Sequence, residues 1–216
     1  MASRPLYKRW GYNAIRTFCR LAGVLGFGLR VYGREHAPRG SAALVCANHQ
    51  SHFDPLIVGL SIDVRINTLA RRSLWNVPGL KHVINYLDAI PIERDGMALA
   101  GIKETLKRLK QNEPVVIFPE GTRSRDGEVA PLKPGFTTLA RRAGVPLVPM
   151  GFDGAYQAWP RTQFFPGCSQ VVVVIGEPIR PAQFAEMDDA ELVAELERRI
   201  RACHAFARRF RQSKYA

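Results

Sequence analysis

Apolar residues along this chain fall into short runs, separated by longer segments in which they recur at three and four residues. The short runs are rich in β-branched residues and bounded by breakers, which is typical of buried strands. They cover residues 42–47, 66–70, 89–92, 115–118, 145–150 and 171–175. Helical length or spacing marks residues 55–62, 73–86, 97–111, 134–143 and about 188–211. This alternation predicts an α/β fold with a mainly parallel central sheet flanked by helices.

The N-terminal region combines an apolar helical stripe with an excess of basic residues. Residues 1–40 carry eight Arg and Lys against one Glu, and the stripe consists of Ile15, Phe18, Ala22, Leu25 and Leu29. An amphipathic helix of this kind suits a membrane interface, but it also suits a first helix packed on the core with a solvated basic face. We divide the chain into a basic amphipathic membrane-associating segment, 1–35, and one folded domain, 36–216.

The charge of the whole chain indicates an anionic partner. Its 216 residues include 31 Lys and Arg but only 19 Asp and Glu, a formal net charge of +12. Nucleic acid, an anionic membrane surface or a phosphorylated substrate would each match this charge. We expect no nucleic acid, because no nucleic-acid motif is present and the aromatic residues do not interleave with the basic ones. No apolar run approaches the roughly 20 residues of a membrane-spanning helix, so no segment is a good transmembrane candidate.

Several common catalytic motifs are missing from the sequence. There is no G-x-S-x-G elbow, no G-x-x-x-x-G-K-[ST] loop and no H-E-x-x-H pair. The four cysteines form no C-x-x-C pair and match no zinc spacing: Cys19, Cys46, Cys168 and Cys203. They indicate reduced thiols in a reducing compartment, and we expect neither a metal site nor a cofactor.

The first candidate site is the segment Asn48–Asp54, NHQSHFD, which follows the predicted strand 42–47. In open α/β sheets, ligands bind at the carboxyl ends of the strands. His49 can act as a general base near neutral pH, and Asp54 can return across a tight turn to orient its ring. No Ser or Cys nucleophile is needed if the substrate supplies its own hydroxyl.

Each of these residues also has a structural interpretation. Asp54 followed by Pro55 is typical of a helix start, with Asp54 as the N-cap. This role is compatible with orienting His49, because the two carboxylate oxygens could serve one role each. His49 could instead be a hydrogen-bonded turn residue, and His52 could join the pair in a metal site, although three ligands without a fourth are weak support.

The second candidate site is Phe118–Ser124, FPEGTRS, at the end of the predicted strand 115–118. Gly121 permits a positive φ and lets backbone amides approach an anion, while Arg123 can grip a phosphate with two parallel hydrogen bonds. Lys133 adds a cation at a predicted helix start. The structural alternative is a surface turn with a solvated arginine.

Two smaller features also lie at predicted strand ends. Arg94 comes just after the strand 89–92, on the expected ligand edge, although an ion pair with Glu93 or Asp95 would explain it equally well. The segment Val148–Gly151 ends a strand at a glycine, which is a structural feature on either interpretation.

Together these four blocks resemble those of the glycerophospholipid acyltransferase family, which includes the 1-acylglycerol-3-phosphate acyltransferases. The family pattern has a histidine and an aspartate separated by four residues, then an arginine after a short strand, as in AIPIER. Its third block is FPEGTRS, matched at every position, and its fourth is a Val-Pro strand end. The blocks keep the family's order over about residues 40–175, so the resemblance makes 36–216 an acyltransferase domain.

The resemblance implies transfer of a fatty acyl group to the free hydroxyl of lysophosphatidic acid, giving phosphatidic acid in phospholipid biosynthesis. The donor would be an acyl thioester, either acyl-CoA or acyl-carrier protein. By this resemblance His49 is the base that takes the hydroxyl proton, Asp54 orients it, and no acyl-enzyme forms. The alternative is the same chemistry on glycerol 3-phosphate, a lysophospholipid or a lyso-aminolipid.

The remaining family residues would bind the acceptor. Arg94, Gly121 and Arg123 would hold its phosphate with help from Lys133, and Glu120 would position Arg123 or contact the acceptor. The sequence departs from many relatives in its short, arginine-interrupted N-terminal segment. We therefore expect a peripheral or monotopic protein on the cytoplasmic face of an anionic membrane. Arg72, which precedes Ser-Leu-Trp where relatives often carry a basic residue before Leu-Phe, is a minor site candidate.

Overall fold

The computed structural model describes most of the chain. The described residues are 16–17, 19–21, 23–71, 76, 90–92, 99–163, 165 and 167–213. The helix expected at 73–86 and the site candidates Arg72 and Arg94 lie outside them.

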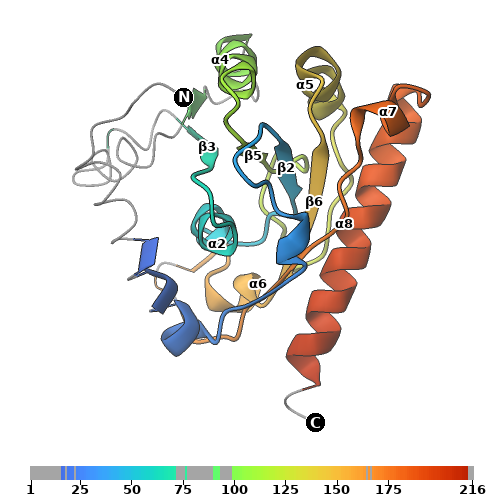
Figure 1. Ribbon diagram of the computed structural model, residues 1–216. Coiled ribbons are helices and arrows are strands. Elements are labelled where there is room, and N and C mark those ends of the chain that lie inside the picture. The colour runs from blue at the N-terminus through green and yellow to red at the C-terminus, as the bar shows by residue number, and fades with distance from the viewer. Residues whose placement is uncertain are drawn as a thin grey trace.

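Seven strands in the described ranges form one sheet, in the order β1-β7-β6-β2-β5-β3-β4 (Figure 1). Their bounds are β1 Arg30–Tyr32, β2 Leu44–Ala47, β3 Asn67–Arg71, β4 Ile90–Ile92, β5 Val115–Ile117, β6 Leu147–Asp153 and β7 Val172–Ile175. The five strands from β6 to β4 run parallel, which confirms the expected mainly parallel sheet. Strand β7 runs antiparallel to β6, and β1 pairs in parallel with β7.

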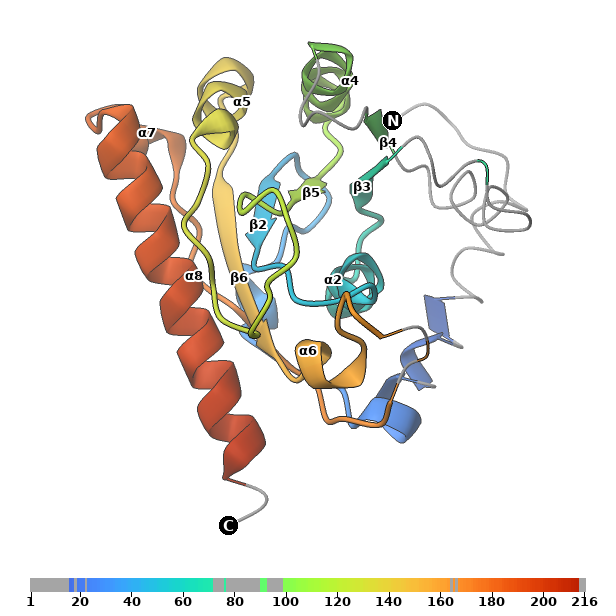
Figure 2. The same cartoon turned by 180° about the vertical axis from the view of Figure 1, so that it is seen from behind.

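Helices cover both faces of this sheet (Figures 1 and 2). Their bounds are α2 Asp54–Ser61, α4 Leu99–Lys110, α5 Gly135–Ala143, α6 Ala155–Ala158, α7 Pro181–Phe184 and α8 Asp189–Gln212, with a 3-10 turn η1 at Arg34–His36. One core layer joins α4, α5, α7 and α8 to one face of the sheet. The other joins α2, α6 and the described N-terminal residues to the opposite face.

The period-two alternation of the buried strands explains why both core layers form. In β2, Leu44 and Cys46 face the layer with α5 and α8, whereas Val45 and Ala47 face the layer with α2. Every residue of β2, β5 and β6 is buried, as expected for strands covered on both faces.

The N-terminal region contributes both a helical stretch and a strand. Residues 16–17, 19–21 and 23–27 are helical. Strand β1 falls within the segment 1–35 that we separated from the folded domain, so part of that segment is joined to the sheet. The division itself stays a prediction. In the part of the chain that the structure describes, no helix is both long and apolar enough to cross a bilayer.

Candidate active site

Two loops that leave adjacent parallel strands form the candidate site. Strand β2 ends at Ala47 and β5 ends at Ile117, and the two strands pair directly in parallel. Their carboxyl ends therefore lie side by side, and the loops beginning at Asn48 and Phe118 meet at one edge of the sheet. The sheet thus brings together the two motifs that the sequence singled out.

The His49 ring is held between a carboxylate and an aromatic ring. Its Nδ1 lies 2.6 Å from Oδ2 of Asp54. The ring stacks on Phe118, with centroids 4.2 Å apart and planes 17° from parallel. The His49 side chain is 20% exposed and Asp54 is fully buried. With Nδ1 bound to the carboxylate, Nε2 is the nitrogen that can receive a proton from a substrate.

A single oxygen of Asp54 accepts hydrogen bonds from several donors. Besides His49 Nδ1, Oδ2 accepts from the backbone N–H groups of Gln50 and Ser51, at 2.6 and 2.7 Å. Burial raises the pKa of Asp54, while the hydrogen bonds from His49 and the two amides oppose that shift. The other oxygen, Oδ1, is buried without a hydrogen-bond partner among the described residues.

The expected capping role of Asp54 is wrong. Phe53 is the N-cap of α2, no side chain caps this helix, and Asp54 is already its first residue. Its carboxylate instead accepts hydrogen bonds from two backbone amides of the preceding turn, those of Gln50 and Ser51. The two carboxylate oxygens therefore do not divide two roles between them.

Glu120 ties the second loop to the backbone of His49. It is 2% exposed, and its two oxygens accept from the backbone N–H groups of His49, at 2.8 Å, and Ala130, at 3.1 Å. The His49 carbonyl in turn accepts from the N–H of Ser124 at 2.6 Å. Burial raises the pKa of Glu120 to about 7. These partners differ from Arg123 and the acceptor, with which we expected Glu120 to interact.

Gly121 and Lys133 lie against each other. Gly121 has a φ of +71°, and a Cβ added there would lie 2.9 Å from Nζ of Lys133. The Lys133 backbone N–H donates to the carbonyl of Pro119 at 2.9 Å, which ties it to the same turn. The structure thus places the Lys133 ammonium directly over the Gly121 backbone, and the positive φ at Gly121 disfavours any other residue there.

Arg123 contacts the His49–Asp54 turn through His52. Its guanidinium lies against the His52 ring, 2.6 Å from Nε2. The pKa of His52 is lowered by partial burial and by the charge of Arg123. The His52 ring also packs on Trp159, at 5.0 Å between centroids. Among the described residues, no group of three His, Cys, Asp or Glu side chains could hold a metal ion.

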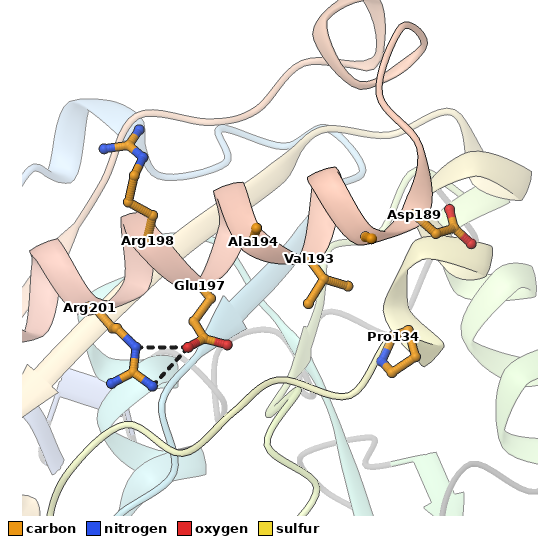
Figure 3. A pocket seen from close by; sticks show the side chains of 8 residues that line it. Pro134, Asp189, Val193, Ala194, Glu197, Arg198 and Arg201 are labelled. Atoms are coloured by element: carbon orange, nitrogen blue, oxygen red, sulfur yellow. Dashed lines mark hydrogen bonds and ion pairs between the residues drawn. The ribbon is translucent and has the colours of Figure 1, made fainter.

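A surface depression of about 740 Å³ lies elsewhere, between the start of α5 and α8 (Figure 3). It is lined by Pro134, Asp189, Ala190, Val193, Ala194, Glu197, Arg198 and Arg201, and by none of the predicted site residues. Glu197 accepts from the backbone N–H of Leu132 at 3.1 Å and binds Arg201 at 2.8 Å. The wall of this depression therefore anchors the segment that leads into Lys133.

Comparison with known proteins gives the same family as the sequence motifs. The family model Acyltransferase matches residues 28–153. The 1-acyl-sn-glycerol-3-phosphate acyltransferase of Bacillus subtilis (strain 168) is 30% identical over 185 residues, 85% of this chain and 88% of that protein. The 1-acyl-sn-glycerol-3-phosphate acyltransferase of Pseudomonas aeruginosa is 31% identical over 209 residues, 92% of this chain and 77% of that protein.

A solved structure has the same fold. The crystal structure of the 1-acyl-sn-glycerophosphate (LPA) acyltransferase from Thermotoga maritima superposes with a TM-score of 0.80 at 27% identity. The match covers 94% of this chain and 81% of that one. The sheet, the order of the motifs and the family model agree, and this chain therefore belongs to the acyltransferase family.

Proposed function

We propose that this protein transfers a fatty acyl group from acyl-CoA or acyl-carrier protein to the free hydroxyl of lysophosphatidic acid, giving phosphatidic acid. The observation that carries the proposal is the 2.6 Å contact between His49 Nδ1 and the buried Asp54 carboxylate. This contact leaves Nε2 for the acceptor hydroxyl. The names of the Bacillus subtilis and Pseudomonas aeruginosa relatives support lysophosphatidic acid as the acceptor.

In the proposed reaction His49 acts as a general base. Nε2 takes the proton of the acceptor hydroxyl while the hydroxyl oxygen attacks the thioester carbonyl carbon. The tetrahedral intermediate collapses with cleavage of the carbon–sulfur bond, and the imidazolium returns the proton to the leaving thiolate. Asp54 stabilises the imidazolium and keeps its Nδ1 protonated, as a carboxylate does in a catalytic triad. No residue of the chain is acylated.

The acceptor phosphate would bind beside this pair. The exposed turn at Gly121 offers backbone to an anion, and the ammonium of Lys133 lies directly over that turn. Arg123, held near the turn by His52, would add a guanidinium, and Arg94 belongs to the same proposed group. Glu120 would act on the reaction through the His49 backbone rather than through the acceptor.

We further propose that the protein works as a peripheral or monotopic protein on the cytoplasmic face of an anionic membrane. Leu25 and Phe165 are 84% and 76% exposed. Phe27, just after Leu25, packs on Phe53, and Phe53 packs on Trp159 ahead of Phe165. Both exposed residues are close in sequence to members of this aromatic cluster, which contacts His52 in the His49 loop. A bilayer at this surface would deliver lipid substrates to the site.

An acceptor panel tests the proposal. Purified protein receives a long-chain acyl-CoA or acyl-carrier protein, and thiol release is followed with lysophosphatidic acid, glycerol 3-phosphate, lysophosphatidylcholine or no acceptor. We expect release that depends on lysophosphatidic acid, with phosphatidic acid as the product in mass spectra. Preference for another acceptor would assign the same chemistry to that compound, and acceptor-independent release would indicate a thioesterase instead.

A further inference from the structure

A buried hydrogen-bond network links the His49 turn to the C-terminal helix. It starts at Gln50, which is fully buried and whose backbone N–H holds Asp54. The Gln50 side-chain nitrogen donates to the carbonyl of Gly127 at 2.5 Å. Its oxygen accepts from the backbone N–H of Tyr156 at 3.4 Å. One neighbour is an acceptor and the other a donor, so they fix the orientation of the amide.

With that orientation, the second proton of the Gln50 amide points to α8. Nε2 of Gln50 lies 3.1 Å from Nε2 of His204, which is 4% exposed. An amide nitrogen only donates, so this ring nitrogen must accept and His204 must carry its proton on Nδ1. The Asp153 carboxylate lies 3.5 Å from the same ring nitrogen and also pairs with Arg208 and Arg211.

Close packing of α8 against β6 puts His204 within reach. At Gly151 in β6, a Cβ would lie 2.3 Å from the backbone nitrogen of His204, so only glycine allows this approach. Figures 1 and 2 both show α8 running alongside β6. The helix also has a complete capping box at Asp188 and Glu191. His204 thus sits on a firmly packed element rather than on a loop.

We propose that Gln50 and His204 are positioning residues for the reaction. His204 holds the Gln50 amide from α8, and Gln50 holds the turn whose backbone amides keep Asp54 against His49. This inference rests on the proposed role of His49 as the base. Neither side chain contacts the reacting atoms, and their effect reaches the chemistry through the geometry of the His49–Asp54 pair.

The kinetic test compares His204→Leu with two other variants of α8. In His204→Leu we expect kcat to fall by about tenfold to a hundredfold, the size of effect of a small misplacement, with the acceptor KM almost unchanged. His204→Gln should restore most of the loss, because its amide oxygen can accept near the position of Nε2. Cys203→Ala is the matched control: Cys203 is 7% exposed and packs on Gly151 and Gly176 rather than on Gln50.

Hydrogen exchange of the Gln50 and Ser51 amides supplies a readout that needs no activity. Both amides donate to Asp54, so their exchange should accelerate in His204→Leu but not in Cys203→Ala. Faster exchange in a protein whose wild type is inactive would support the positioning role and contradict only the proposed function. Unchanged kcat, unchanged exchange, or no rescue by His204→Gln would each overturn the inference. If His204→Leu does not fold, Gln50→Met removes the same bond from the other side.

Discussion

At the scale of single residues, Asp54 binds both the ring of the proposed base, His49, and the backbone of the turn that carries His49. One oxygen accepts both the His49 ring and two backbone amides of the turn that carries it. The position of the ring and the conformation of the turn are therefore fixed by the same atom. This coupling explains why a short motif with a fixed spacing is enough to build the pair.

Replacing this carboxylate should slow the reaction without unfolding the protein. In Asp54→Asn the amide is neutral and cannot stabilise the imidazolium, so we expect kcat/KM to fall by at least about 10²-fold. Steady-state thiol release measures the effect, and a circular dichroism melt checks the fold. A variant within a few-fold of wild type would show that His49 works without its carboxylate.

The raised pKa of Glu120 predicts a pH-dependent stability. In the folded protein its pKa is about 7, above the ordinary 4.5, so the folded state binds an extra proton between these values. The free energy of unfolding should therefore fall as pH rises from about 5 to 7, by at most about 1.4 kcal/mol per pH unit for one proton. Glu120→Gln should flatten that slope in urea titrations, and an equally steep slope in the variant would assign it to other groups.

Local sequence motifs predict the candidate site residues, whose roles stay predictions, but not the residues that pack around them. His49, Asp54, Glu120, Gly121, Arg123 and Lys133 were all found from local motifs. Gln50 lies inside the first motif, but no feature of the sequence indicates a role for its side chain. Its partner His204 lies 154 residues away, and the contact exists only because α8 crosses β6 at a glycine. No local pattern contains that information.

At the scale of elements, the turn after β5 packs against the segment before α5, and we propose that the two bind the acceptor phosphate together. Lys133 lies over Gly121 and is tied by its backbone to Pro119. We expect Lys133→Met to raise the acceptor KM about tenfold, since a charged hydrogen bond contributes about 1.5–3 kcal/mol. Donor KM should not change. Lys107→Met on α4 removes an exposed lysine charge that pairs with Glu104, and it serves as the control.

The element predictions succeeded wherever the pattern was strong. The six expected strands and the four expected helices that fall in the described residues are present, with ends shifted by at most three residues. Strand β1 was missed because its three residues, Arg-Val-Tyr, lie at the end of an apolar helical stripe. The reversed direction of β7 was not predicted, because an apolar run looks the same in parallel and antiparallel buried strands.

At the scale of the whole molecule, the proposed membrane attachment depends on exposed apolar side chains such as Leu25, which is 84% exposed. Burying one leucine side chain contributes about 1.5–3 kcal/mol. We therefore expect Leu25→Glu to weaken binding to phosphatidylglycerol vesicles at least about tenfold in flotation assays. Phe210→Ser, which changes a 38% exposed apolar residue on α8, should bind like wild type. Equal binding of both variants would assign membrane attachment to another surface.

The central claim is that His49 activates the acceptor hydroxyl directly. Its most direct test is the initial rate of thiol release from an acyl thioester, in the presence of lysophosphatidic acid, for wild type and His49→Ala. We expect a rate at least about 10²-fold lower in the variant, the usual effect of losing a general base, with an unchanged circular dichroism spectrum. A His49→Ala rate within a few-fold of wild type would contradict it.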